Sequence, residues 1–287
     1  MRKWLSTMAV LFLLASPVYA HEGEEEFSAG IEVDGEEIVR INYHPTSIED
    51  ARKIGVGEDM TSKQREEFNT SDLFGKAGHL IAKKDIKIGD LDVPAGEYPC
   101  GTNLDSEMNV YFTVWMKDGD AEKPKKSRMT VSEMDRMGPT NLLMVFRPTA
   151  DGKGSQLSLV HGRYVVEVPV GASGEAGSGS SEKGVLHYST GVVVDDEEVL
   201  RVHHYATPYA EGKNFNDMKN AKMDAEHLAY FNKSDRFGKV GKIRAKRDAK
   251  LGDIEVKAGE YTCGLNADDK GNFSFVLWTG EGEGEKT

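Results

Sequence analysis

An internal repeat constrains the fold of this chain more than any other feature of its sequence. The segments Phe68–Trp115 and Phe231–Trp278 align without a gap at an offset of 163 residues, and 26 of 48 positions are identical. The match continues upstream at an offset of 161, where residues 27–43 parallel residues 188–204. Self-similarity of this length is typical of a duplicated structural unit. The sequence therefore predicts two related domains.

The N-terminus carries the pattern of a secretory signal peptide over residues 1–20. Arg2 and Lys3 precede a short apolar run, and the segment closes on the small residues of Val18-Tyr19-Ala20. The repeat and the composition then divide the rest of the chain. We expect an acidic leader at 21–26, a first repeat at 27–170, a Gly/Ser linker at 171–184 and a second repeat at 185–287.

Net charge narrows the classes of partner. The chain holds 36 basic and 48 acidic residues, which gives a formal net charge of −12. Nucleic acids and anionic membrane surfaces repel such a chain, so we expect neither as its main partner. After the signal peptide no apolar stretch is long enough to cross a bilayer. These observations predict a periplasmic or secreted protein without membrane insertion after signal cleavage.

Alternating short strands dominate both repeats. In residues 38–43 the side chains of Val39, Ile41 and Tyr43 share one face by the two-residue period of a strand. Helical spacing is expected once in each repeat. Many short strands with glycine-rich turns predict an all-β fold of two antiparallel β-sandwich, jelly-roll-like domains, each with one short helix. The helices are expected within 61–68 and 216–230, and further strands at 97–103, 109–116, 141–146, 156–160 and 163–168.

The second repeat lacks a counterpart of residues 129–170, so its sheet is expected to end in an open edge. Open sheet edges are usually covered by another element. We therefore expect a strand-completing partner, or a homo-oligomer, at this edge.

Several short motifs resemble one family when they are read in order. They are Ile41-Asn42-Tyr43-His44-Pro45-Thr46, Ala51-Arg52-Lys53-Ile54, Phe74-Gly75-Lys76, Asp85–Gly89, Val93–Tyr98, Leu157–Gly162 and Val166–Val170. Together they resemble the domain of unknown function 2911 family, which consists of exported bacterial β-rich domains. The family's Trp-Arg-x-Gly-Ala-Asn block is missing, because Ala77-Gly78-His79 leads directly into the next strand. The resemblance thus implies a fold and an export route, and no functional residue.

The two cysteines, Cys100 and Cys263, occupy equivalent positions in the repeats. In an oxidising compartment they could form a disulfide, provided that a pseudo-twofold axis brings them together. The alternative, which we favour, is that each thiol is a small buried hydrophobe on its own strand.

One polar motif, Phe-Asn-x-Ser-Asp-x-Phe-Gly-Lys-x-Gly, occurs in both repeats and holds the candidate ligand-binding residues. Asn and Asp side chains also cap turns, and this reading is favoured over a binding site. The motif does not match a phosphate-binding loop. The candidate residues are Ser71, Asp72 and Lys76 in the first copy, and Ser234, Asp235 and Lys239 in the second.

No catalytic or metal-binding constellation is visible. His203 and His204 are adjacent, so a regular strand would point them to opposite faces. We expect no metal ion and no cofactor. The sequence favours a non-catalytic binding or envelope-structural protein with a protein or glycan ligand. The alternative is a periplasmic or secreted hydrolase with a site in the inter-domain cleft.

Overall fold

The structure is a computed structural model, and it describes residues 25–54, 60–134, 138–149, 154–172, 186–195, 197–205, 224–235, 237–278 and 285–286. The expected signal peptide, nearly all of the acidic leader and residues 173–185 of the expected linker lie outside these ranges. The described chain divides into two compact units. The N-terminal unit holds the described residues from Glu26 to Ala172, and the C-terminal unit holds those from His187 onward.

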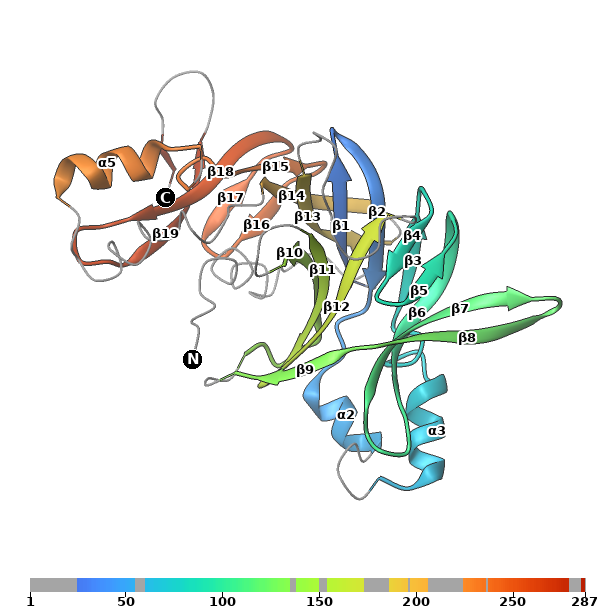
Figure 1. Cartoon of the computed structure of the whole chain (residues 1–287). Helices are drawn as coiled ribbons and strands as arrows, with labels where there is room; N and C mark the ends of the chain where they lie inside the picture. The colour runs from blue at the N-terminus through green and yellow to red at the C-terminus, as the bar shows by residue number, and fades with distance from the viewer. Residues whose placement is uncertain are drawn as a thin grey trace. The chain divides into compact units, whose positions relative to one another are not determined.

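An antiparallel sheet forms the larger part of the N-terminal unit. Its strand order is β1-β2-β3-β6-β7-β8, and its strands run from blue to green in Figure 1. Their bounds are β1 Glu25–Val33, β2 Glu36–Tyr43, β3 Gly78–Ala82, β6 Gly96–Leu104, β7 Val110–Asp118 and β8 Ala121–Arg128.

The predicted alternation decides which face of this sheet is buried. Val39, Ile41 and Tyr43 are fully buried on one face of β2, and Phe112 and Val114 are fully buried on β7. The predicted pairing of β6 with β7 is confirmed. The period-two pattern thus identified the core side of these strands correctly.

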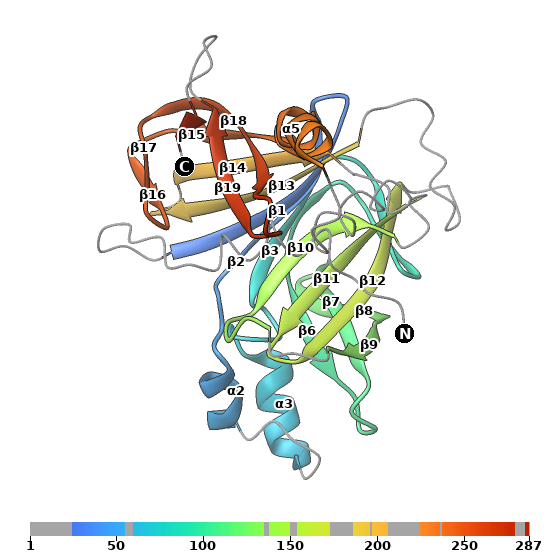
Figure 2. The same cartoon turned by 90° about the vertical axis from the view of Figure 1, so that its left-hand side faces the viewer.

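A second antiparallel sheet in the N-terminal unit has the order β10-β11-β12-β4-β5, and β9 pairs with β12 beside it (Figure 2). The turn at His161-Gly162 joins β11 to β12, as the sequence predicted. The two sheets are connected by the Tyr43 hydroxyl, which donates to the Met144 carbonyl over 3.2 Å. The bounds are β4 Ile86–Ile88, β5 Leu91–Val93, β9 Thr130–Glu133, β10 Leu143–Pro148, β11 Ser155–His161 and β12 Tyr164–Ala172.

The expectation of one helix in the first repeat was wrong. Besides α3 (Ser62–Thr70), which matches the prediction, the N-terminal unit contains α2 (Ile48–Ile54). The start of α2 is marked by a reciprocal pair, because the Asp50 backbone N–H donates to the Ser47 hydroxyl and the Ser47 N–H donates to the Asp50 carboxylate. This capping pattern, with its acidic residue three positions after Ser, was present in the sequence and overlooked.

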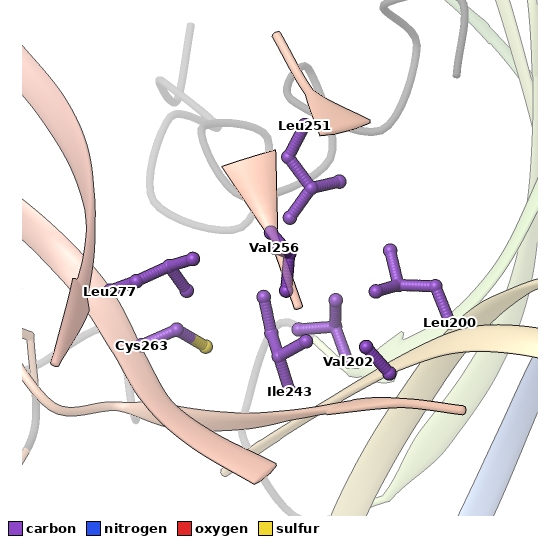
Figure 3. Close-up of a cluster of buried hydrophobic side chains, with 8 residues drawn as sticks. Leu200, Val202, Ile243, Leu251, Val256, Cys263 and Leu277 are labelled. Carbon is purple, nitrogen blue, oxygen red and sulfur yellow. The ribbon is translucent and has the colours of Figure 1, made fainter. Parts of the chain in front are cut away.

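The C-terminal unit has the sheet order β20-β19-β18-β15-β14-β13, a separate β16-β17 pair and the helix α5 (Ala225–Lys233). Residues 216–223 of the expected second helix lie outside the described ranges. A cluster of aliphatic side chains around Cys263 fills the core between these strands (Figure 3). The bounds are β13 Leu186–Val194, β14 Glu197–Tyr205, β15 Gly241–Ala245, β16 Ala249–Leu251, β17 Ile254–Val256, β18 Gly259–Ala267, β19 Phe273–Trp278 and β20 Glu285–Lys286.

Local details recur between the units at the offsets of the sequence repeat. A register shift lies between Ile31 and Glu32 in one unit and between Val192 and Val193 in the other. The turn that follows contains a positive-φ aspartate in both, Asp34 at φ 53° and Asp195 at φ 52°. The shared residues therefore adopt the same backbone geometry twice.

The units differ after the tryptophan that closes each repeat. In the N-terminal unit β8 pairs with β7 from Tyr111 to Asp118, and the two strands form a long hairpin (Figure 1). In the C-terminal unit the only described pairing on that side of β19 is with β20, opposite Leu277 and Trp278.

Candidate functional site

The repeated polar motif forms the end of a helix and a tight turn in both units. The Ser71 hydroxyl donates to the Phe68 carbonyl over 2.9 Å, and the Lys76 N–H donates to the Ser71 carbonyl over 2.8 Å. Ser234 makes the matching bonds to Phe231 and Lys239, each over 2.8 Å. These two serines therefore stabilise the turn, and ligand binding through them stays a prediction.

Close packing makes glycine necessary inside this turn. A Cβ atom on Gly75 would lie 2.0 Å from the Asn69 carbonyl oxygen, and one on Gly238 would lie 1.7 Å from the Asn232 carbonyl oxygen. Both distances are far below van der Waals contact, so any side chain would push the helix away from the turn.

Each turn is also attached to the neighbouring strand. The Asn69 amide donates to the Leu104 carbonyl over 2.9 Å and accepts from the Leu104 N–H over 2.7 Å. Asn232 makes the same two bonds with Ala267, over 2.9 and 2.8 Å. The turn is thereby held at a defined place on the sheet in each unit.

The two candidate lysines lie over tryptophan rings. Lys76 Nζ is 4.7 Å from the ring centroid of Trp115, and Lys239 Nζ is 4.9 Å from that of Trp278. Both distances are within the range of a cation–π interaction. The lysine and the indole together present a positive charge beside an aromatic surface.

The same turn also fixes the orientation of each indole. Trp115 Nε1 donates to the Gly75 carbonyl over 2.8 Å, and Trp278 Nε1 donates to the Gly238 carbonyl over 2.8 Å. Sequence reasoning missed the tryptophans. Their identical spacing of 40 residues from the glycine in both repeats could have indicated the contact.

The two lysine–tryptophan pairs differ in their carboxylate partner. Lys76 Nζ lies 2.9 Å from the Glu122 carboxylate of β8. Among the described residues, no carboxylate forms an ion pair with Lys239. The ammonium group is thus neutralised within the N-terminal unit, whereas in the C-terminal unit its described partner is the indole alone.

The remaining candidate residues of the motif, Asp72 and Asp235, are exposed in the turns. The structure brings each into the same turn as its lysine. Ligand binding by these two carboxylates stays a prediction as well.

Both cysteines are free and buried, each on its own strand. Burial raises the pKa of the Cys263 thiol to about 12 and raises that of Cys100 further. A thiol with such a pKa stays protonated near neutral pH, and only the thiolate is a strong nucleophile. Neither cysteine is therefore suited to nucleophilic chemistry in this environment.

The histidines of the described chain do not assemble into a metal site. No group of three or more His, Cys, Asp or Glu side chains able to hold an ion occurs in the described residues. His203 is opposite Ser189 and His204 is opposite Tyr188, so the adjacent pair occupies two faces of β14. Burial, with smaller contributions from His203 and His187, lowers the pKa of His204 to about 4.

A polar cluster on the second sheet of the N-terminal unit is satisfied internally. The Arg147 Nε donates to the Ser158 hydroxyl over 2.7 Å, and its guanidinium forms an ion pair with Glu167. The Gln156 amide and the Ser158 hydroxyl also donate to the Glu167 carboxylate, over 2.7 and 2.8 Å. These contacts join β10, β11 and β12 and give the cluster a structural role.

The N-terminal unit also carries an open groove of about 480 Å³ where β7 begins and β8 ends. Arg128 donates to the Asn109 side-chain oxygen over 2.6 Å at this groove. The C-terminal unit has no described counterpart of β8, so the groove is not repeated there. It is lined by Met108, Asn109, Val110, Arg128, Met129, Thr130 and Val131.

Comparison of this chain with protein-family models, with curated proteins and with solved structures finds no match. Within the described residues, no helix has both the length and the apolar character needed to span a membrane. The site must accordingly be judged on its own geometry, and the lysine–tryptophan pair of the C-terminal unit is its most distinctive element.

Proposed function

We propose that this chain is an exported, non-catalytic binding protein, and that its C-terminal unit binds an acidic ligand beside Lys239 and Trp278. One observation carries the proposal. The same lysine–indole arrangement occurs in both units, but a carboxylate, Glu122, accompanies it only in the N-terminal unit. A ligand carboxylate would take the corresponding place beside Lys239.

We further propose that the units arose by duplication of one β-sandwich module. The repeat offset of 163 residues relates α3 to α5, β3 to β15 and β6 to β18, each with the same length. In the N-terminal unit a hydrogen bond between Tyr43 and Met144 joins the two sheets, as expected of two packed layers. The resemblance to the domain of unknown function 2911 family is in keeping with this architecture.

The chemistry of the pair favours carboxylates over neutral ligands. An ammonium group donates charge-assisted hydrogen bonds to a carboxylate, and such bonds are about twice as strong as neutral ones. The indole adds an apolar surface against which the carbon atoms of a sugar or a peptide can pack. Acidic glycans and acidic peptides both meet these requirements.

Binding is best tested by NMR on a chain that begins at His21, because this chain holds only Trp115 and Trp278. Oligogalacturonate and a short poly-glutamate peptide serve as the two probes. We expect either probe to shift the Trp278 indole N–H signal and to leave that of Trp115 in place. Lys239→Ala should abolish the shift, whereas the matched variant Lys76→Ala should not.

The proposal is contradicted if neither probe moves the Trp278 signal. It is also contradicted if the chain releases products from oligogalacturonate or from the peptide, since that would indicate a hydrolase. Export has its own test. Expression with the native leader in a Gram-negative host should give a periplasmic or secreted product that starts at His21, as determined by N-terminal sequencing.

A further inference from the structure

The outer edge of the first sheet is covered and protected in the N-terminal unit. There β8 pairs with every residue of β7 from Tyr111 to Asp118. The exposed β8 carries Lys123, Lys125 and Lys126 with Pro124 between them. Lysine and proline on an edge strand prevent further strands from adding to a sheet.

The corresponding edge in the C-terminal unit is different. Ser274, Phe275 and Val276 of β19 are equivalent to residues that pair with β8 in the other unit, but they have no described partner on this side. The sequence of β19, Phe-Ser-Phe-Val-Leu-Trp, contains neither charge nor proline. Its backbone groups at these positions are available for pairing with an added strand.

A matched pair of glycines reports the empty position next to this edge. A Cβ atom on Gly89 would lie 2.0 Å from the Ser127 hydroxyl oxygen of β8 and 2.9 Å from a methyl group of Val168. A Cβ atom on the equivalent Gly252 would have nothing within 4 Å among the described atoms. The C-terminal unit therefore leaves open the volume that β8 and β12 fill in the N-terminal unit.

Lys239 adds a requirement of charge to this open edge. In the N-terminal unit, β8 itself supplies Glu122 to the equivalent Lys76. A strand that covered β19 in the same register would place one of its side chains beside Lys239, and a carboxylate there would neutralise the ammonium group. The edge, the volume and the charge thus describe one missing strand.

We propose that the outer edge of β19 is the docking site for an extended strand of another polypeptide, which pairs with β19 in antiparallel orientation. This inference rests on the proposed function and names its ligand. By analogy with Glu122 and Ser127, the strand carries an acidic residue beside Lys239 and, five residues later, a small residue opposite Phe275. Main-chain hydrogen bonds provide affinity in such complexes, and the two side chains provide specificity.

A synthetic peptide with the sequence of residues 118–129, which contains Glu122 and Ser127, is the probe. Hydrogen exchange of the chain from His21 onward measures its effect on the backbone. We expect the peptide to slow amide exchange at Ser274, Phe275 and Val276, and a scrambled peptide of the same composition to have no effect.

The protein variants separate this site from general charge attraction. Lys239→Glu should weaken peptide binding about tenfold, as expected from the loss of one charge-assisted hydrogen bond, whereas Lys76→Glu should change it by less than about twofold. A peptide with tryptophan in place of Ser127 should bind at least about tenfold more weakly, because the bulky side chain does not fit opposite Phe275.

Three outcomes would overturn the inference. Acidic probes that shift the Trp278 signal while the β19 amides remain unprotected would retain the proposed function and exclude strand docking. Self-association of the chain in sedimentation velocity, with protection of β19 and no peptide present, would identify a second copy as the occupant. Protection of β19 that disappears when residues 279–287 are deleted would identify the chain's own C-terminal segment.

Discussion

The two units place the same strand framework in two different surroundings. In the N-terminal unit the Tyr43 hydroxyl donates to Met144 of the second sheet. The equivalent residue of the C-terminal unit is His204, whose Nδ1 is buried without a partner in the described residues. The repeated residues determine where a side chain lies in the sheet, and the strands packed around it determine whether its polar atoms are satisfied. A buried polar atom without a partner destabilises a fold.

The largest effect is expected from alanine at the paired glycines. Gly89 and Gly252 have almost the same φ, +61° and +58°, so the backbone strain of an alanine is the same in both units, about 1 kcal/mol. At Gly89 the clash with Ser127 and Val168 adds to this strain. We expect Gly89→Ala to lower the free energy of unfolding by about 3 kcal/mol in total, and Gly252→Ala by about 1 kcal/mol.

Urea unfolding followed by tryptophan fluorescence measures both variants, because Trp115 and Trp278 report on different units. Equal effects of the two substitutions would contradict the difference in packing. Addition of the β8 peptide should enlarge the effect at Gly252, since the bound strand would restore the missing neighbour.

The second effect is a pH dependence confined to the C-terminal unit. The pKa of His204 is about 4 in the folded chain against a usual value of 6.5, so between these values the unfolded chain binds a proton that the folded chain does not. Stability is therefore complete above about pH 6.5 and is lost as the pH falls toward 4, by up to about 3 kcal/mol. Unfolding curves of wild type and His204→Phe between pH 4 and 7 test this, and equal slopes would contradict it.

Opposite signs are expected when phenylalanine replaces the two equivalent residues near neutral pH. Tyr43→Phe removes a donor from the Met144 carbonyl and should destabilise the N-terminal unit by about 1 kcal/mol. His204→Phe removes a buried unsatisfied nitrogen and should stabilise the C-terminal unit by about 1 kcal/mol. Thermal unfolding of each variant provides the measurement, and two shifts of the same sign would refute the comparison.

The smallest effect is expected at the lysines. Lys76→Met removes both the cation–π contact and the ion pair with Glu122, whereas Lys239→Met removes only the contact with Trp278. We expect losses of about 1 kcal/mol and about 0.5 kcal/mol, because both sites are partly exposed. Raising the salt concentration to about 1 M should reduce the first loss more than the second, since salt screens exposed ion pairs. An unchanged difference at high salt would argue against the role of Glu122.

Sequence reasoning succeeded where short-range patterns decide the structure. The alternation in β2 and β7 predicted their buried faces, and the turn at His161-Gly162 was predicted as found. It failed at β8, whose sequence Ala-Glu-Lys-Pro-Lys-Lys-Ser-Arg has no apolar period. An exposed edge strand needs none, because its backbone pairs with β7 while its side chains remain in water. The lysine–tryptophan contacts were missed for a related reason, since they join residues about 40 positions apart.

The sequence by itself determined that two units share one backbone plan, because identical residues at a fixed offset form the same turns, the same register shift and the same strand lengths. Only the tertiary structure decided that Lys76 meets a carboxylate, that Gly89 is tightly enclosed and that Gly252 is not. The physical reason is that local conformation depends on neighbours along the chain. The environment of a side chain depends on which distant strands pack against it.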